Sequence, residues 1–234
     1  MALVEAVHLE KTYKNGEIET KAIRGVDFTI EPGSFVSFIG PSGSGKSTLL
    51  NLIGCLDPPT GGTLTVAGQN IRGLDRRQSA DFRGRNIGFV FQDFNLIPVL
   101  TVYENVEYPL LMVRRVPPAE RKKRVLELLE AVGMTDQVDK YPGQISGGQK
   151  QRVAVARALV TNARLVLADE PTANLDRETA GRIIRLMKKM RDEFKTTFIF
   201  STHDPRVVNN AEIIFTIEDG TLRQNSHPEE GFHG

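Results

Sequence analysis

A glycine-rich segment, Gly40 to Thr48, has the sequence G-P-S-G-S-G-K-S-T and holds the residues best suited to chemistry. Its glycines allow the chain to curl so that successive backbone N–H groups point at one anion. Lys46 adds a mobile positive charge for the outer phosphates, and the Ser47 hydroxyl suits Mg²⁺. A short apolar strand precedes the segment and an apolar helix follows it, which is the context of a P-loop. We therefore predict a site for a nucleoside triphosphate, formed by Gly40, Pro41, Ser42, Gly43, Ser44, Gly45, Lys46, Ser47 and Thr48.

Two carboxylates, Asp169 and Glu170, end an apolar segment of strand character. Beside a P-loop on the same sheet, an Asp in this position holds the Mg²⁺ shell. Glu170 then lies by the terminal phosphate, where a carboxylate can act as general base toward water. The alternative is that both acids merely end a strand in solvent. The P-loop favours the catalytic interpretation.

Gln92 and His203 also follow strand-like segments. Ligand sites collect at the carboxyl ends of parallel strands, so both side chains are candidates for the same site. We predict that Gln92 ligates Mg²⁺ or the attacking water, and that His203 senses the terminal phosphate. A structural role for His203 is the alternative.

A second anion-binding candidate is the segment I-S-G-G-Q at Ile145 to Gln149. Ser146 is a good N-cap for a helix that continues to Leu159, and glycines at a helix N-terminus favour anion binding. An ordinary turn and cap is the alternative. Two chains facing head to tail would use such a loop on each other's phosphate. The predicted ligands are Ser146, Gly147, Gly148 and Gln149.

Tyr13 precedes a hairpin signal, Asn15-Gly16. It is either an aromatic residue at a strand edge or a ring on which adenine stacks.

Composition restricts the class of protein. The chain has 234 residues, 40% of them hydrophobic, which suffices for a full core and a subdomain. With 30 basic and 29 acidic residues the net charge is +1, so nucleic acid is not an expected partner. Cys55 is the only cysteine, which suits the cytosol. The first residues do not resemble a signal peptide, and no apolar run approaches the roughly 20 residues of a membrane span. We expect another chain to supply any spans.

The order of elements predicts an α/β core with an inserted helical subdomain. Strand-forming segments dominate residues 1–92 and 161–224, and helical patterns dominate residues 93–160. Thr101 and Glu104 form a capping box at one helix start. Residues 225–234 are predicted to be a flexible tail. The loop Asp93 to Leu100 holds many large apolar residues, and either the core or a partner is expected to cover them.

Taken together, the motifs resemble the ATP-binding cassette family over residues 1 to 224. The matching segments occur in the family's order: Gly40–Ser47, Gln92, Ile145–Gln149, Leu165–Glu170, Asn174–Asp176 and His203. The resemblance implies a P-loop NTPase core with a RecA-like mixed sheet and an antiparallel β subdomain. It implies a homodimeric or heterodimeric ATPase that closes around two ATP molecules with Mg²⁺, and Tyr13 matches the adenine-stacking aromatic.

By the same resemblance, Ser146, Gly148 and Gln149 act on the partner's nucleotide, and the loop Asn174–Asp176 crosses the dimer seam. The sequence departs from the family's pattern at two places, and both departures are small. Ile145 replaces a usual Leu, which keeps an apolar anchor, and Ala173-Asn174 replaces a commoner small pair.

Within the family, Asn51–Asp57, Phe89–Leu111 and Leu167–Thr172 resemble the lipoprotein-release and macrolide-export branch. That branch couples ATP-driven closure to a membrane apparatus. The implied partner is a multi-span permease, and the implied location is the cytoplasm, peripheral on the inner face of the membrane. The loop Phe94–Leu100 would then help to form a groove for a cytoplasmic helix of the permease.

Two other functions are alternatives to a transporter subunit. A cassette ATPase acting on DNA or the ribosome would need a coiled-coil insertion between Gly45 and Ser146, or a second cassette, and the sequence has neither. A module that uses ATP-driven dimerisation to recruit or signal at the membrane, as in cell division, is not separated from the transporter by sequence.

Overall fold

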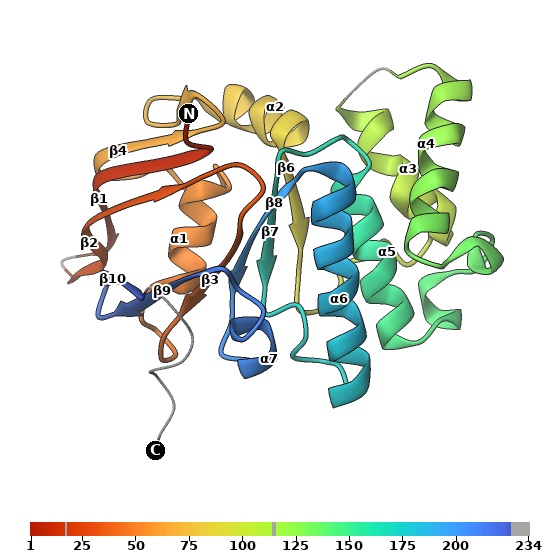
Figure 1. Cartoon of the computed structure of the whole chain (residues 1–234). Coiled ribbons are helices and arrows are strands. Elements are labelled where there is room, and N and C mark those ends of the chain that lie inside the picture. Colours follow the sequence, from red (N-terminus) through yellow and green to blue (C-terminus); the bar gives the residue numbers. More distant parts are fainter. Residues whose placement is uncertain (17, 114–115, 226–234) are drawn as a thin grey trace.

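The computed structural model describes residues 1–16, 18–113 and 116–225 and contains two β-sheets with helices between and beside them (Figure 1). The antiparallel sheet has the strand order β2-β1-β4-β5. Its strands are β1 (Val4–Asn15), β2 (Ile18–Ile30), β4 (Gly61–Val66) and β5 (Gln69–Asn70). Thr12, Tyr13 and Lys14 pair with Lys21, Thr20 and Glu19, so the predicted hairpin is present.

The second sheet has the order β10-β9-β3-β8-β7-β6. Its strands are β3 (Phe35–Ile39), β6 (Ile87–Val90), β7 (Leu165–Asp169), β8 (Thr197–Ser201), β9 (Ile213–Glu218) and β10 (Thr221–Asn225). All neighbouring strands run parallel except β9 and β10, so the sheet is mixed. The parallel strands place their carboxyl ends at one edge, where the candidate residues gather.

The helices are α1 (Lys46–Ile53), α2 (Arg76–Asn86), α3 (Val102–Met112), α4 (Pro118–Ala131), α5 (Gly147–Leu159), α6 (Arg177–Phe194) and α7 (Pro205–Val208). Single 3₁₀ turns cover Thr135–Gln137 and Pro142–Gln144. The predicted capping box at Thr101 and Glu104 is present, and Ser146 caps α5 as predicted. Strand β5 and helix α7 were not predicted, because each is too short for a periodic pattern.

The core follows from the alternation of side chains along the strands. In β7, Leu165 and Leu167 pack toward α1 and the antiparallel sheet, whereas Val166 and Ala168 pack toward α5 and α6. Both faces of the sheet are therefore buried, which explains the continuous apolar runs of its strands. Figure 1 shows α1 between the two sheets and α5 and α6 on the opposite face.

The predicted helical subdomain shares its core with the α/β part. Buried side chains of α3, α4 and α5 form one cluster with those of β7, β8 and α6. The division into residues 1–92, 161–224 and 93–160 remains a prediction. Of the predicted tail, Asn225 ends β10, and residues 226–234 lie outside the described residues. Among the described segments, no helix has the length and apolarity that a membrane span requires.

Substitution of Gly88 tests how closely the backbones of β6 and α5 pack. A Cβ added at Gly88 would overlap the carbonyl oxygen of Ala158. We predict that Gly88→Ala lowers the free energy of unfolding by about 1–3 kcal/mol, because the backbones would have to separate. In Gly181→Ala, on α6, the new Cβ meets only the guanidinium of Arg185 at 3.5 Å. That control should raise stability by up to about 1 kcal/mol. Urea unfolding measures both, and equal stability of the two variants would contradict the packing.

Candidate functional site

A cavity of about 800 Å³ opens at the carboxyl ends of β3, β7 and β8. It brings together most of the predicted residues, although they lie far apart in the sequence. Those that line it are Gly40, Pro41, Ser42, Gly43, Gly45, Lys46, Ser47, Thr48, Gln92, Asp169, Glu170 and His203. Tyr13, Ser44 and the loop at Ser146 do not line it.

The glycine loop is held between the two sheets by close backbone contacts. Gly40 and Gly45 have φ angles of 151° and 112°, in the region that favours glycine. A Cβ at Gly40 would overlap the Ile217 carbonyl oxygen of β9, and one at Gly45 would lie 2.6 Å from the Ala22 oxygen of β2. The loop therefore requires glycine at both positions.

The loop fits a phosphate chain. The Nζ of Lys46 donates to the carbonyl oxygens of Gly40 and Pro41, each at 2.8 Å, so its charge lies across the loop. An ammonium group has three donors, which leaves one for another acceptor. The Ser44 hydroxyl is buried without a hydrogen-bond partner among the described residues. The helix α1 begins at Lys46 and adds its positive end.

The donor set beside the loop suits Mg²⁺. The Ser47 hydroxyl lies 3.4 Å from Asp169 Oδ1, and Gln92 lines the same cavity. Within the described ranges, no group of three or more His, Cys, Asp or Glu side chains is placed to hold a metal. Mg²⁺ prefers oxygen ligands and usually keeps substrate phosphates and water in its shell, and the hydroxyl, carboxylate and amide oxygens of Ser47, Asp169 and Gln92 are ligands of that kind.

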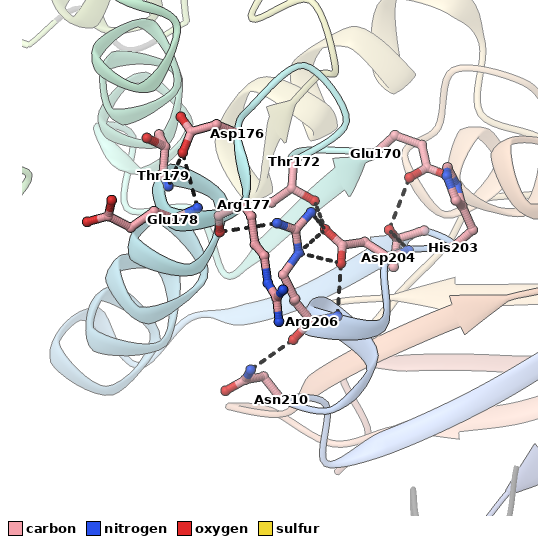
Figure 2. A network of polar contacts seen from close by, with 11 residues as sticks. Glu170, Thr172, Asp176, Arg177, Glu178, Thr179, His203, Asp204, Arg206 and Asn210 are labelled. Carbon is pink, nitrogen blue, oxygen red and sulfur yellow. Dashed lines mark hydrogen bonds and ion pairs between the residues drawn. The ribbon is translucent and has the colours of Figure 1, made fainter. Parts of the chain in front are cut away.

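Glu170 is held in an unusual backbone conformation. Its φ is 44°, and its N–H donates to the Ser201 carbonyl oxygen at 2.9 Å. Such a conformation costs roughly 1–3 kcal/mol and is typical of functional sites. Its carboxylate contacts His203 Nδ1 through Oε1 at 2.7 Å and accepts from the Thr202 hydroxyl through Oε2 at 3.0 Å. Figure 2 shows the pair of Glu170 and His203. The two predicted catalytic side chains are therefore in contact.

Tyr13 is fixed by two residues that the sequence did not indicate. Its hydroxyl donates to Asp57 Oδ2 at 2.7 Å, and the Nζ of Lys11 lies 4.9 Å from the ring centroid. Lys11 is buried and also pairs with Asp57. Burial and the hydrogen bond to Asp57 raise the pKa of the Tyr13 phenol above its ordinary value. The ring remains 40% exposed, as a base-stacking surface requires.

The loop at Ser146 lies in a second cavity of about 420 Å³. Ser146 and Gln149 form a capping box, in which each side chain accepts the other residue's backbone N–H. The cavity is lined by Ser146, Gly148, Gln149, Arg152, Thr179 and Arg182 together with Gly133 and Met134. Ser146 is therefore absent from the lining of the P-loop cavity of its own chain.

The segment after Gln92 is held by polar contacts from both sides. The Asn174 side chain donates to the Gln92 carbonyl oxygen and to Asp93. The guanidinium of Arg157, on α5, donates to the carbonyl oxygens of Phe94 and Asn95. Arg157 has no motif spacing that marks it from sequence.

The loop after Gln92 has a packed part and an exposed part, and a partner for the exposed part stays a prediction. Leu96 packs against the core, whereas Val99 is 78% exposed. Buried Asn105 binds the backbone of Ile97, Leu100 and Thr101, so the exposed part has a defined shape.

Comparison with known proteins identifies the family. Residues 23–173 match the family model described as ABC transporter. The chain belongs to this family. A Thermotoga maritima protein described as an uncharacterized ABC transporter ATP-binding protein is 46% identical over 94% of this chain and 93% of its own length. The lipoprotein-releasing system ATP-binding protein LolD 1 of Caulobacter vibrioides is 42% identical over 98% of each chain.

The macrolide export ATP-binding/permease protein MacB of Syntrophobacter fumaroxidans is 43% identical over the whole of this chain, which spans 32% of that relative. A solved dimeric structure of the cassette MJ0796, in a post-hydrolysis state bound to ADP and Pi, has a TM-score of 0.86 and 44% identity. It covers 98% of this chain and 100% of that one. The predicted family, its LolD/MacB branch and the P-loop NTPase fold are confirmed. With the family, ATP as ligand and ATP hydrolysis as activity are confirmed as well. The roles of individual residues remain predictions.

Tyr13 offers a direct test of the base-stacking prediction. We expect Tyr13→Ala to weaken ATP binding about tenfold, because stacking of a base on an aromatic ring contributes roughly 1–3 kcal/mol. Binding of inorganic triphosphate, which has no base, should not change. Titration calorimetry with both ligands makes the comparison, and Tyr108→Ala on α3, which removes an equally exposed ring, is the control. Equal weakening for both ligands would assign Tyr13 a structural role instead.

Proposed function

We propose that this chain is the ATP-hydrolysing subunit of a transport system, that two copies close around two Mg-ATP, and that closure drives a separate membrane subunit. One observation carries the proposal. The P-loop and Glu170 line one cavity, whereas the Ser146 loop lines another. Each chain thus holds two half-sites, which become complete when two copies pair head to tail.

The binding step uses residues of one chain. Backbone N–H groups of the glycine loop and the N-terminus of α1 receive the phosphates, and Lys46 turns its charge toward the outer ones. Ser47, Asp169 and Gln92 would hold Mg²⁺. The ion, when bound, neutralises charge on the phosphoryl oxygens and helps to align them. The Tyr13 ring stacks on the base.

The chemical step uses Glu170 as general base. Its Oε1 accepts a proton from the water that attacks the terminal phosphorus, and ADP leaves. His203 contacts that same oxygen and faces solvent, with a side chain that is 78% exposed against 18% for Glu170. His203 can therefore orient the base and contact the terminal phosphate.

The second half-site supplies charge stabilisation from the partner copy. Gly147 and Gly148 begin α5 after the N-cap Ser146, so their N–H groups and the helix dipole favour an anion. The capping box holds these groups in place before any ligand arrives. Aimed at the partner's terminal phosphoryl group, they stabilise charge that grows during transfer.

A membrane partner follows from the relatives' names. LolD is named as the ATP-binding protein of a releasing system, and MacB is named as an ATP-binding and permease protein. We propose that the loop from Phe94 to Leu100, with exposed Val99, receives a cytoplasmic helix of a multi-span permease. The chain would then lie peripherally on the cytoplasmic face of the membrane. Co-purification with that permease tests this part.

A recruiting or signalling module is the second candidate, since ATP-driven dimerisation alone would serve it. The intact pair of Glu170 and His203 favours turnover. Absence of steady-state hydrolysis with the native membrane subunit present would favour the module.

Glu170 is the residue on which turnover depends. We predict that Glu170→Gln lowers ATP hydrolysis by at least about 100-fold, because a general base typically contributes 10²–10⁴-fold. ATP binding should persist and a stable dimer should accumulate, as seen by light scattering. Glu178→Gln changes an exposed carboxylate on α6 and should leave the rate unchanged. Wild-type turnover by Glu170→Gln would remove Glu170 from the mechanism.

Mixing two inactive variants tests the shared site. Lys46→Ala disables the P-loop, and Ser146→Arg places a long side chain at the tip of α5. Each variant alone should be inactive. Mixed at equal amounts, they should recover about a quarter of the wild-type rate, because random pairing puts one intact site in about half of the dimers. No recovery, with mixed dimers present, would mean that both residues act within one chain.

A further inference from the structure

We propose that Thr202, Asp204 and Thr172 form a positioning unit that fixes the Glu170 carboxylate relative to the loop predicted to cross the dimer seam. The inference rests on the proposed function, in which Glu170 is the general base. Thr172 ends the segment Leu167–Thr172 noted in the sequence, but no motif gives a role to Thr172, Thr202 or Asp204. None of the three lines the cavity, and Figure 2 shows the polar contacts that connect Thr172, Asp204 and Arg206.

Thr202 determines which oxygen of Glu170 is available. Its side chain is fully buried. Its hydroxyl accepts the Asp204 backbone N–H at 3.0 Å, so its only proton is directed to Glu170 Oε2, also at 3.0 Å. The Thr202 N–H donates to the Phe38 carbonyl oxygen of β3, the strand that leads into the P-loop. Oε2 is thereby engaged, and Oε1 is the oxygen left for His203 and water.

Asp204 is a buried carboxylate whose oxygens are fully used. It is 8% exposed. It accepts from the Thr172 hydroxyl at 2.7 Å and from the guanidinium and backbone N–H of Arg206. Burial alone would raise the pKa of the Asp204 carboxyl, but the hydrogen bonds from Arg206 and Thr172 lower it below its ordinary value. The charged form is thus the one that this site holds.

Residues 173–176, here called the seam loop, are restrained at both ends by the Asp204 carboxylate, directly at one end and through Arg206 at the other. Thr172, at the start of the loop, binds Asp204 directly. At the other end, Arg206 Nη1 donates to the carbonyl oxygen of Arg177, the first residue of α6. Figure 2 shows Arg206 between Asp204 and Arg177. Residues 173–176 lie between these anchors, so a displacement of the loop by the partner copy acts on Asp204.

These contacts connect the seam loop to the Glu170 carboxylate. Asp204 connects to Thr202 through its backbone N–H, and Thr202 connects to Glu170. When the partner copy displaces the seam loop, the loop and the Glu170 carboxylate move together, because Asp204 and Thr202 connect them. Thr202 and Asp204 are positioning residues, because neither lines the cavity where ATP would bind.

Thr202→Val tests the unit with a side chain of nearly the same shape but no hydroxyl. We expect kcat to fall about tenfold, because the base loses its fixed orientation while it remains present. The Kd for a non-hydrolysed ATP analogue should change less than about twofold, since Thr202 is outside the cavity. Thr202→Ser restores the hydroxyl and should recover most of kcat. A loss of kcat and affinity together, not recovered by Ser, would indicate a merely structural role.

A double-mutant cycle tests the connection to the seam loop. Thr172→Val removes the bond between the loop and Asp204 but leaves the Arg206 pair intact. If the residues act as one unit, the double variant should lose little more kcat than Thr202→Val alone. Independent, multiplying losses would overturn the proposal. Should Thr172→Val not fold, Arg206→Lys replaces it in the same cycle, since it keeps the charge but loses the bidentate geometry.

One control variant, and a comparison of Thr202→Val with Glu170→Gln, separate this inference from the proposed function. Arg191→Gln removes an arginine of α6 that pairs with Asp192 and Glu212, away from the site, and should leave kcat unchanged. If Glu170→Gln is inactive but Thr202→Val turns over at the wild-type rate, only the positioning role fails. If Glu170→Gln itself turns over normally, the proposed base fails.

Discussion

The close approach of the glycine loop to two backbones is the constraint on which the rest of the site depends. Gly40 lies against a carbonyl oxygen of β9, and Gly45 lies against one of β2. The first strand belongs to the mixed sheet and the second to the antiparallel sheet, so the loop is clamped where the two sheets meet. The contacts fix the loop backbone before any ligand arrives, and in the proposed binding step the Lys46 side chain turns toward the phosphates. Any side chain at these positions would force the sheets apart.

Apolar packing stabilises the sheets and their helices, and polar contacts add to it near the expected dimer seam. The sheet and its flanking helices are fixed by buried side chains on both faces. The segments nearest the expected dimer seam pack Leu96 and Leu175 against this core and are held in addition by arginines and hydroxyls. Arg157 holds the loop after Gln92, and Arg206 holds the start of α6. Hydrogen bonds are directional, whereas apolar contacts are less specific in geometry. A segment held by hydrogen bonds can therefore shift between a few defined arrangements.

Much of the fold could be predicted because local patterns carry it. The capping box at Thr101 and the N-cap at Ser146 start α3 and α5 as predicted, since N-cap chemistry depends on residues only three positions apart. The buried strands β7 and β8 appear as continuous apolar runs. Strand β5 was missed because two residues show no period, and its pairing with β4 alone defines it. The division into subdomains was predicted from the order of strand and helix patterns and stays a prediction, because α5 packs both on α3 and α4 and on β6.

The sequence by itself determined the chemistry of this protein: a P-loop, an acidic strand end and a glycine-led helix tip, each specified by short spacing. The tertiary structure decided how those parts are supported. Lys11 and Asp57 fix Tyr13, and Thr202 fixes Glu170, through contacts that span 32 to 46 residues of sequence. No periodicity or motif encodes such pairs, since they arise only when folding brings β1 beside the loop after α1, and the ends of the parallel strands β7 and β8 beside each other. The separation of the P-loop and Ser146 into two cavities was likewise decided by the packing of α5 against the sheet.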